Sequence, residues 1–480
     1  MPITGREREI EDLNSLYDSD QAQLVAIYGR RRVGKTFLVE SVFKDRITFQ
    51  HAGLSPVENG QAHLLKDQLK FFYLSLQYQG LKGGKKPRSW MEAFFLLQRF
   101  FDERDDGNRQ RVFLDELPWM DTPKSGFMTA FEGFWNNWGC HRENLMVVVC
   151  GSANSWILDN LINNHGGLYN RVTWQIHLQP FTLYECEQFF SEKRVILSRY
   201  DIAQSYMILG GIPYYMNYFR SGLSLSQNID RLFFTDGAPL RDEYHRLFST
   251  VFSNPEIMKS IVESLSTKRS GLTRKELLEQ LRIKDGAAVS NWLHALLASG
   301  FITNYVPFGE SRRNSRFKLT DPFCLFYLRF IRNQQPDSEA FWQEYAGTQA
   351  STVWKGFAFE NVCFQHIRQI KTALGITGVA SRQSAWSKTG DGTEDGTQID
   401  LLIERKDNIV NMCEIKFYSE SFTVDKAYDQ ILRRRTNLLR QYLSPKAAIH
   451  STLITTFGLS YNAYSGAFVK VITLDDLFSG

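Results

Sequence analysis

The sequence predicts a multidomain α/β protein with a parallel sheet in its N-terminal part, helical segments in the middle and a second α/β domain at its C-terminal end. Three observations lead to this prediction. The chain has 480 residues, which is too long for one hydrophobic core. Apolar strands alternate with helical stretches from residue 23 to residue 178, and two further apolar strands lie near residues 398–417.

The composition is that of an ordinary globular protein, with 43% hydrophobic and 22% charged residues. The net charge of +4 is too small to indicate a nucleic-acid partner by itself. The six cysteines are scattered and form no C-x-x-C pair, which is typical of a reducing compartment. The N-terminus lacks the apolar stretch of a signal peptide, and no segment is apolar over the length of a bilayer. We therefore expect a cytoplasmic protein with no membrane partner.

Residues 29–36 read G-R-R-R-V-G-K-T, the pattern G-x-x-x-x-G-K-[ST] of a loop that holds phosphate groups. Its glycines allow backbone N–H groups to surround phosphate oxygens, Lys35 reaches the terminal phosphates, and the Thr36 hydroxyl can coordinate Mg²⁺. The run 24–28 predicts a buried strand before the loop, and the run 37–43 predicts a helix whose N-terminus faces the anion. A glycine-rich turn without a ligand is the alternative. The residues expected at the nucleotide are Gly29, Arg32, Val33, Gly34, Lys35, Thr36 and Phe37.

Two further predicted strands end in polar residues. The apolar run 111–114 ends at Asp115 and Glu116. Asp115 would hold Mg²⁺ through water, and Glu116 would orient the water that attacks the terminal phosphate. A strand with a solvated acidic end would also explain this pair. The run 145–152 ends at Ser152, which either senses the terminal phosphate or caps the next helix.

Arg171 precedes a short predicted strand over residues 172–178. An arginine at this place could reach a phosphate on a neighbouring subunit as an arginine finger, although a plain surface charge is the alternative. The alternation of strands and helices up to this point predicts a mostly parallel sheet with helices on both faces.

Taken together, these motifs resemble those of the archaeal-type ATPases, a branch of the AAA+ and STAND-like phosphate-loop proteins. Residues 4–7, T-G-R-E, are similar to the box that helps to enclose adenine in this branch, and residues 211–213, G-I-P, match its G-x-P motif. The resemblance covers roughly residues 1–250. It implies binding of ATP or ADP with Mg²⁺, regulated hydrolysis, a finger role for Arg171 and a lid that moves with the nucleotide state. It adds three expected nucleotide contacts, Gly5, Arg6 and Pro213.

The middle of the chain predicts a winged helix-turn-helix. Helices are expected over residues 273–281 and 287–297, and a hairpin over residues 300–305 and 315–320. The hairpin tip, 309–316, is basic and could lie against DNA phosphates. The second helix has few basic residues, so a module used only for domain packing is the alternative.

Near the C-terminus, Asp400 lies in one apolar run, and Glu414 and Lys416 lie in the next. Two carboxylates on adjacent strands can hold Mg²⁺ at a phosphodiester, and a lysine beside them can position the attacking water. Glu360, in a predicted helix, could complete this metal site. The alternative is that Glu414 and Lys416 alternate onto a solvent-exposed face as an ion pair.

This D…E-x-K arrangement resembles the restriction-endonuclease-like PD-(D/E)xK superfamily over about residues 340–480. The sequence departs from the pattern at Ile399, where many members have proline. The basic run 433–435 on a following helix could track a phosphate backbone, although an ordinary solvated helix face would have the same composition.

We therefore expect four parts: an ATPase core, a helical lid, a winged helix and a nuclease-like domain, at residues 1–180, 181–250, 251–334 and 335–480. The predicted function is that of an ATPase whose nucleotide state controls the winged helix and a metal-dependent nuclease-like domain that acts on DNA. The alternative is an ATP-dependent signalling or scaffold switch whose C-terminal domain binds a partner or nucleic acid without cleaving it. Arg171 also raises the prospect of a homo-oligomer.

The expected catalytic residues are Lys35, Glu116, Arg171, Asp400, Glu414 and Lys416, and the expected metal ligands are Thr36, Asp115, Glu360, Asp400 and Glu414.

Overall fold

The computed structural model describes residues 3–55, 57–58, 61–62, 64–152, 154–163, 166–332, 338–388 and 397–480. The chain forms two compact units. The first unit contains residues 1–180, 247–255 and 288–300, and the second contains residues 181–246, 256–287 and 301–480. The domain boundary expected between residues 334 and 335 lies outside the described residues.

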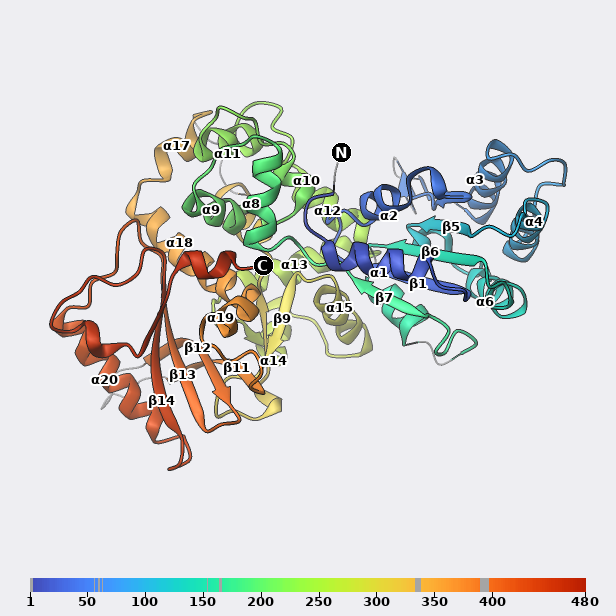
Figure 1. The fold of residues 1–480 in the computed structure, drawn as a ribbon. Coiled ribbons are helices and arrows are strands. Elements are labelled where there is room, and N and C mark those ends of the chain that lie inside the picture. The colour runs from blue at the N-terminus through green and yellow to red at the C-terminus, as the bar shows by residue number, and fades with distance from the viewer. Residues whose placement is uncertain are drawn as a thin grey trace. The chain divides into compact units, whose positions relative to one another are not determined.

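The first unit is built on a sheet of five parallel strands in the order β2-β5-β6-β1-β7 (Figure 1). The predicted parallel sheet is therefore confirmed. Strands β1 and β6 are buried along their whole length, as expected for the centre of a parallel sheet covered on both faces. The strands are β1 (Gln23–Tyr28), β2 (Phe49–Ala52), β5 (Gln110–Asp115), β6 (Leu145–Gly151) and β7 (Trp174–His177).

An aromatic core packs against this sheet. Helix α4 (Trp90–Asp102) buries Trp90, Phe94 and Leu97, which recur at helical spacing, and Phe94 stacks on Phe134 of α6 (Phe127–Asn137). The other helices of this unit are α1 (Glu7–Tyr17), α2 (Lys35–Phe43), α3 (Leu65–Tyr78), α5 (Leu117–Met120) and α7 (Asn154–Ile157), and α15 (Ala287–Ala298) joins it from residue 288 onward.

The second unit begins with helices and a small antiparallel sheet in the order β8-β10-β9. Strands β9 (Ile302–Tyr305) and β10 (Arg316–Leu319) form the predicted hairpin, and β8 (Leu272–Thr273) pairs with β10. The helices are α8 (Leu183–Glu192), α9 (Arg199–Leu209), α10 (Pro213–Met216), α11 (Leu225–Phe233), α13 (Pro255–Ser266), α14 (Arg274–Leu281), α16 (Pro322–Phe330), α17 (Phe341–Tyr345), α18 (Gln349–Gln365) and α19 (Ile367–Ala373). Helix α12 (Glu243–Val251) is divided, because its residues from 247 onward belong to the first unit.

A second five-stranded sheet, in the order β11-β12-β13-β14-β15, completes this unit (Figure 1). The first three strands are antiparallel, and β13, β14 and β15 are parallel. Helix α20 (Lys426–Arg440) connects β13 to β14 and buries Leu432 and Leu439 in the core of this sheet. The strands are β11 (Ser381–Lys388), β12 (Thr397–Arg405), β13 (Ile409–Lys416), β14 (Ala448–Thr455) and β15 (Lys470–Ile472).

Within the described ranges, the helices are all too short or too polar to span a bilayer. The six cysteines are free thiols, and five of them are buried.

His366 joins the start of α8 to the end of α18. Its side chain is 1% exposed, its Nδ1 lies 2.8 Å from the carbonyl oxygen of Val362, and its Nε2 accepts a hydrogen bond from the N–H of Leu183 at 2.9 Å. Nε2 must be unprotonated to accept this bond, so Nδ1 donates to Val362. Burial lowers the pKa of His366 to about 4.

The stability of the protein should therefore depend on the protonation of His366. Because the folded-state pKa lies below the ordinary value of about 6.5, the neutral imidazole stabilises the fold above pH 6.5, and this contribution is lost as the pH falls toward 4. We expect the difference in unfolding free energy between wild type and His366→Gln, measured by urea denaturation, to shrink by on the order of 2 kcal/mol between pH 7 and pH 4.5. Exposed His141→Gln is the control for loss of an imidazole. A difference for His366→Gln that stays constant with pH would contradict the prediction.

Candidate nucleotide site and C-terminal carboxylate site

The phosphate loop connects the end of β1 to the start of α2. A side chain at Gly29 would clash with the carbonyl oxygen of Leu178, so the loop passes close to the segment that follows β7. Gly34 has a φ of 97°, and a Cβ built on it meets no heavy atom within 4 Å. Arg32 also has a positive φ, 72°, and Val33 is buried. The N-terminus of α2 thus opens onto free space bordered by glycine, which fits a phosphate group.

Lys35 is held inside the loop. Its side chain is 5% exposed, and Nζ donates to the carbonyl oxygens of Gly29 at 3.0 Å and Arg30 at 3.2 Å and to Oγ of Ser152 at 3.0 Å. Burial lowers the pKa of this ammonium group. Three oxygen atoms therefore hold the ammonium group of Lys35 in place within the phosphate loop.

Ser152 connects Lys35 to the acidic end of β5. Strand β6 lies between β1 and β5, so the residue that follows β6 is placed between the loop and the carboxylates. Ser152 accepts from Lys35, donates through Oγ to Oε1 of Glu116 at 2.8 Å, and donates through its N–H to Oε2 at 3.0 Å. Three residues from three adjacent segments therefore form one hydrogen-bonded chain.

Thr36 and Asp115 form a second pair beside this chain. The Thr36 hydroxyl donates to Oδ2 of Asp115 at 2.7 Å, and the N–H of Glu116 donates to Oδ1 at 2.9 Å. Burial raises the pKa of Asp115. A hydroxyl and a carboxylate oxygen in contact are suitable ligands for Mg²⁺, so the residues present fit the expected cation.

Asn154 connects the start of the phosphate loop to α15. It is fully buried, and its Oδ1 accepts a hydrogen bond from the N–H of Gly29 at 3.0 Å. Its Nδ2 donates to the carbonyl oxygen of Ala298, the last residue of α15, at 2.9 Å. Both ends of the Asn154 carboxamide are therefore engaged by backbone groups.

The remaining residues expected at the nucleotide lie in different surroundings. Gly5 and Arg6 are buried, and Arg6 donates to the carbonyl oxygen of Gln179, just after β7, at 2.7 Å. Phe37 is 45% exposed on α2, and Arg171 is exposed in the turn before β7. The position of Arg171 leaves its guanidinium accessible, and its finger role stays a prediction.

The G-x-P motif forms the corner between α9 and α10 in the second unit. Gly211 has a φ of 65°, and a side chain there would clash with the carbonyl oxygen of Phe181 and the ring of Tyr206. Pro213 is the first residue of α10, where a missing N–H has no cost. Packing within this unit therefore explains the glycine, and Pro213 as a nucleotide contact stays a prediction.

The C-terminal carboxylates lie on neighbouring elements. The antiparallel register that pairs Leu401 with Cys413 brings Asp400 of β12 beside Glu414 of β13, and the N–H of Ile415 donates to the Asp400 carboxylate. Burial, followed by the Glu414 charge, raises the pKa of Asp400. Burial and the Asp400 charge raise the pKa of Glu360, on α18, to about 7. The structure therefore places Glu360 and Asp400 within electrostatic reach of each other.

Glu414 is fully buried, so the interpretation of Glu414 and Lys416 as an ion pair on a solvent-exposed face is wrong. Nη1 of Arg435 lies 2.6 Å from both carboxylate oxygens, and the Tyr428 hydroxyl donates to Oε2 at 2.8 Å. Nζ of Lys416 lies 4.0 Å from the same oxygen. The neighbours of the carboxylate are thus mainly an arginine and a tyrosine.

These partners have a consequence for the expected metal ligands. Among the described residues, no group of three or more His, Cys, Asp or Glu side chains is arranged to hold a metal ion. The Glu414 carboxylate is instead bonded to Arg435 and Tyr428, and the metal-ligand roles of Glu360, Asp400 and Glu414 stay a prediction. Sequence reasoning missed this role of Arg435, since nothing local separates it from the adjacent arginines.

The basic run on α20 is divided between two environments. The side chain of Arg433 is 76% exposed and pairs with Asp429, whereas that of Arg435 is 20% exposed and faces Glu414. The three arginines therefore do not form one continuous basic surface, because Arg435 is paired with the buried Glu414 carboxylate.

Comparisons with known proteins concern mainly the nucleotide site. Residues 3–219 match the model of a family described as an ATPase domain predominantly from Archaea. An uncharacterised protein of Methanocaldococcus jannaschii is 23% identical over 444 residues, which are 90% of this chain and 91% of that protein. A Walker-type ATPase of Pyrococcus abyssi is 19% identical, covers 68% of this chain and 96% of its own, and has a TM-score of 0.48. The ORC2 protein of Aeropyrum pernix in its ADPNP–ADP complexes is 14% identical over 69% of this chain and 95% of its own, with a TM-score of 0.41. The family match identifies an archaeal-type ATPase domain in residues 3–219 and supports nucleotide binding there.

Because Glu414 is paired with Arg435, we predict that two arginines of α20 contribute very differently to the unfolding free energy. Arg435→Ala leaves a buried carboxylate without its counter-charge, and we expect it to lower the unfolding free energy by about 3 kcal/mol. Arg433→Ala removes an exposed pair and should cost less than about 0.5 kcal/mol. Urea denaturation measures both values. Adding Glu414→Gln to Arg435→Ala should recover part of the loss, and equal effects of the two single changes would contradict the assignment.

Proposed function

We propose that this chain is an ATP-hydrolysing switch whose N-terminal site binds ATP with Mg²⁺ and whose nucleotide state controls the second unit. The observation that carries this proposal is the hydrogen-bonded chain from Lys35 through Ser152 to Glu116, beside the Thr36–Asp115 pair. It joins the group that neutralises phosphate charge to the group that orients water, which is the pairing that phosphoryl transfer to water needs.

Each residue of this site has a definite role in the proposed reaction. Lys35 turns from the loop carbonyls toward the terminal phosphates. Thr36 and Asp115 would hold Mg²⁺, which would supply charge neutralisation at the phosphate oxygens. Glu116 accepts a hydrogen bond from the attacking water. Ser152 is a positioning residue, because its hydroxyl and N–H hold the Glu116 carboxylate in place. Arg171, exposed before β7, is available to a neighbouring copy as the finger.

Asn154 supports the coupling of this site to the middle of the chain. One carboxamide bonds both the first N–H of the phosphate loop and the last carbonyl of α15. Helix α15 is the second helix of the predicted winged helix, residues 251–334. Movement of the loop around a phosphate would therefore pull directly on this helix.

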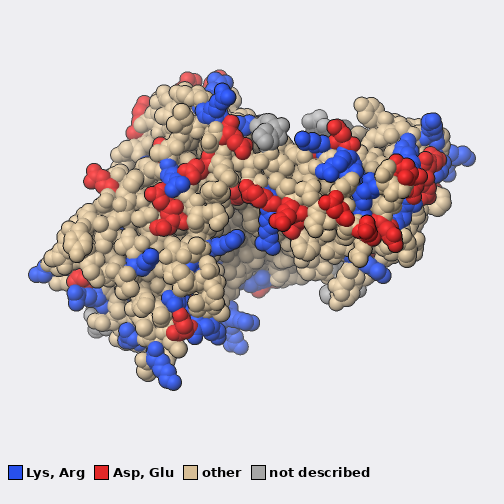
Figure 2. Space-filling view, in the orientation of Figure 1, with Lys and Arg blue, Asp and Glu red and all other residues tan. Residues whose placement is uncertain are grey.

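DNA is the partner that we propose for the winged helix. On the one face that Figure 2 draws, acidic side chains lie among basic ones over much of the surface, although basic ones outnumber them at the lower left, and the proposed DNA contact is argued from local residues. Arg312 and Arg313, in the turn between β9 and β10, are exposed and fit such a local contact. Arg274 at the start of α14 is paired with Asp285 and is less available.

A metal-dependent nuclease at Asp400, Glu414 and Lys416 is a second candidate function. It is favoured by the position of Asp400 and Glu414 on adjacent strands. Burial and then the Asp400 charge raise the pKa of Glu360, and burial and then the Glu414 charge raise the pKa of Asp400; a divalent cation would offset the repulsion between these carboxylates. It requires Arg435 to release Glu414. The alternative is a C-terminal unit that binds nucleic acid or a protein without cleavage.

The ATPase proposal predicts that substitutions at three residues impair different steps, either ATP binding or ATP hydrolysis. Glu116→Gln should lower the steady-state rate of phosphate release at least about 100-fold while ATP is still bound, because the water loses its acceptor. Lys35→Ala should lose ATP binding itself. Ser152→Ala removes the hydroxyl that holds the Glu116 carboxylate, while the N–H of residue 152 still donates to it, and should lower the rate about tenfold with little effect on KM.

Glu103→Gln, a change at a surface residue of the same unit, is the matched control and should keep the wild-type rate. Hydrolysis that survives in Glu116→Gln would remove the proposed role of this carboxylate. A wild-type rate in Ser152→Ala would show that the hydrogen-bonded chain has no part in the reaction.

The nuclease candidate is tested with plasmid and single-stranded DNA in Mg²⁺ or Mn²⁺, with and without ATP. If it is correct, cleavage occurs and is lost in Asp400→Asn, because the carboxylate that would bind the cation is absent. Asp407→Asn, at the exposed turn after β12, should cleave like the wild type. Lys35→Ala shows whether ATP controls cleavage. No cleavage by the intact protein, with ATP hydrolysis still present, would favour the non-cleaving switch.

A further inference from the structure

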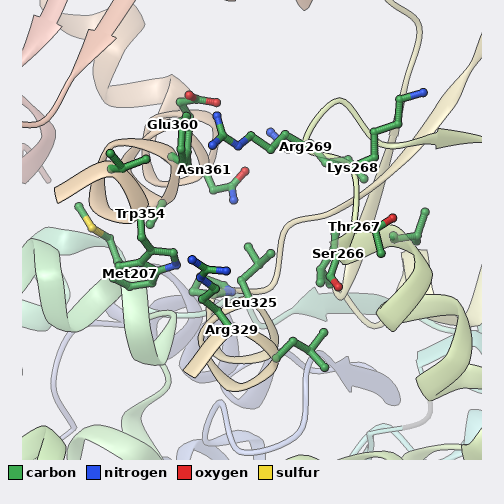
Figure 3. A pocket seen from close by; sticks show the side chains of 18 of the residues that line it. Met207, Ser266, Thr267, Lys268, Arg269, Leu325, Arg329, Trp354, Glu360 and Asn361 are labelled. Carbon is green, nitrogen blue, oxygen red and sulfur yellow. The ribbon is translucent and has the colours of Figure 1, made fainter. Parts of the chain in front are cut away.

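The second unit contains a cavity of about 460 Å³ that none of the roles above explains (Figure 3). One face of α18 forms one wall. The loop between α13 and β8, strand β10 and helix α16 form the others. All of these elements belong to the second unit, and the volume lies in the range of small-molecule sites.

The charged residues of the lining are mainly basic. Arg269, Lys318 and Arg329 line the cavity, and Glu360 is the acidic residue among the lining side chains. In Figure 3 the guanidinium of Arg269 is directed toward Glu360, whereas Lys268 extends away from the cavity. Lys318 and Arg269 both lie in the electrostatic field of Glu360, so Arg329, which is exposed, is the basic lining residue left to attract an anion.

Asn361 gives the cavity a polar group suited to a ligand. It is 7% exposed, its Oδ1 has no hydrogen-bond partner among the described residues, and Figure 3 shows its carboxamide directed into the cavity. Buried amide groups are normally hydrogen-bonded, so an unpaired one facing a cavity indicates that a ligand supplies the partner. A carboxamide both donates and accepts, which matches the edge of a nucleobase.

Trp354 supplies a flat apolar wall. Its ring packs edge-on against Phe330, with centroids 5.1 Å apart, and against Trp342, with centroids 5.9 Å apart. These contacts hold the indole in one orientation while another part of it lines the cavity. Aromatic side chains held in this way are surfaces on which bases stack.

We propose that this cavity binds one nucleoside monophosphate unit, either a free nucleotide or the phosphorylated end of a single strand. Arg329 contacts the phosphate, Trp354 stacks on the base, and Asn361 bonds the base edge. This binding needs neither ATP hydrolysis nor cleavage of DNA, and although Glu360 is shared with the candidate nuclease site, no metal ion takes part.

The test is isothermal titration calorimetry of the full-length chain carrying Lys35→Ala, in EDTA, so that the phosphate loop and any divalent cation do not contribute. The probes are dTMP, thymidine, and tetrathymidylate with and without a 5′-phosphate. We expect dTMP to bind at least tenfold more tightly than thymidine. Equal affinity for dTMP and the phosphorylated tetranucleotide identifies a free nucleotide as the ligand, and tighter binding of the phosphorylated strand identifies a strand end.

Two variants test the residues. Asn361→Leu keeps the volume of the side chain and removes its hydrogen-bonding groups, and Arg329→Ala alters an exposed residue whose loss should not affect folding. Each should weaken the binding of the phosphorylated probe at least tenfold, whereas Arg332→Ala, which lies outside the cavity lining, should change it less than twofold. Glu360→Gln should tighten binding, because the acidic lining residue is lost.

The proposal is overturned if neither phosphorylated probe binds at millimolar concentration, or if Asn361→Leu and Arg329→Ala bind like the parent. Arg329→Ala keeps the test decisive even if Asn361→Leu unfolds. Binding is measured without divalent cations, whereas the nuclease candidate is tested by cleavage with Mg²⁺ or Mn²⁺. Absence of nucleotide binding and absence of cleavage are therefore separate results.

Discussion

The burial of Lys35 is the constraint on which the N-terminal site depends. An ammonium group that is 5% exposed is stable only if oxygen atoms surround it, and here they come from the loop itself and from Ser152. The second source requires β6 to lie next to β1. The same placement puts Ser152 within reach of Glu116 at the end of β5. The position of β6 between β1 and β5 therefore places Ser152 where it can bond both Lys35 and Glu116.

The two acidic sites differ in what holds their carboxylates. Asp115 accepts hydrogen bonds from a hydroxyl and a backbone N–H, which are neutral donors that can share the carboxylate with a cation. Glu414 is bonded to a guanidinium, and a buried ion pair is expensive to separate. A cation at the nucleotide site would therefore need less rearrangement of its carboxylate than a cation at Glu414 would.

Local patterns explain how much could be predicted from the sequence. The strands β1, β5, β6, β12 and β13 and the hairpin of β9 and β10 were predicted, because apolar runs and periodicity are short-range signals. Strand β11 was not, since S-R-Q-S-A-W-S-K is mostly polar and has no apolar run, although Trp386 packs into the core of the sheet. The residues that would contact phosphate were predicted from one motif. The bonds of Asn154 to Gly29 and of Arg435 to Glu414 were not, because they join residues that are distant in sequence or indistinguishable from their neighbours.

Asn154 makes the phosphate loop and α15 mechanically dependent on each other. Its carboxamide is short and fully buried, and its two ends bond backbone groups of Gly29 and Ala298. A planar amide cannot lengthen, so a shift of the loop by the width of a hydrogen bond must either carry the end of α15 with it or break one of the two bonds. Breaking a bond would leave one end of the buried Asn154 carboxamide unpaired, at a cost of about 1–3 kcal/mol. Following the loop is the less costly response, which supports the proposal that nucleotide binding acts on the rest of the chain through α15.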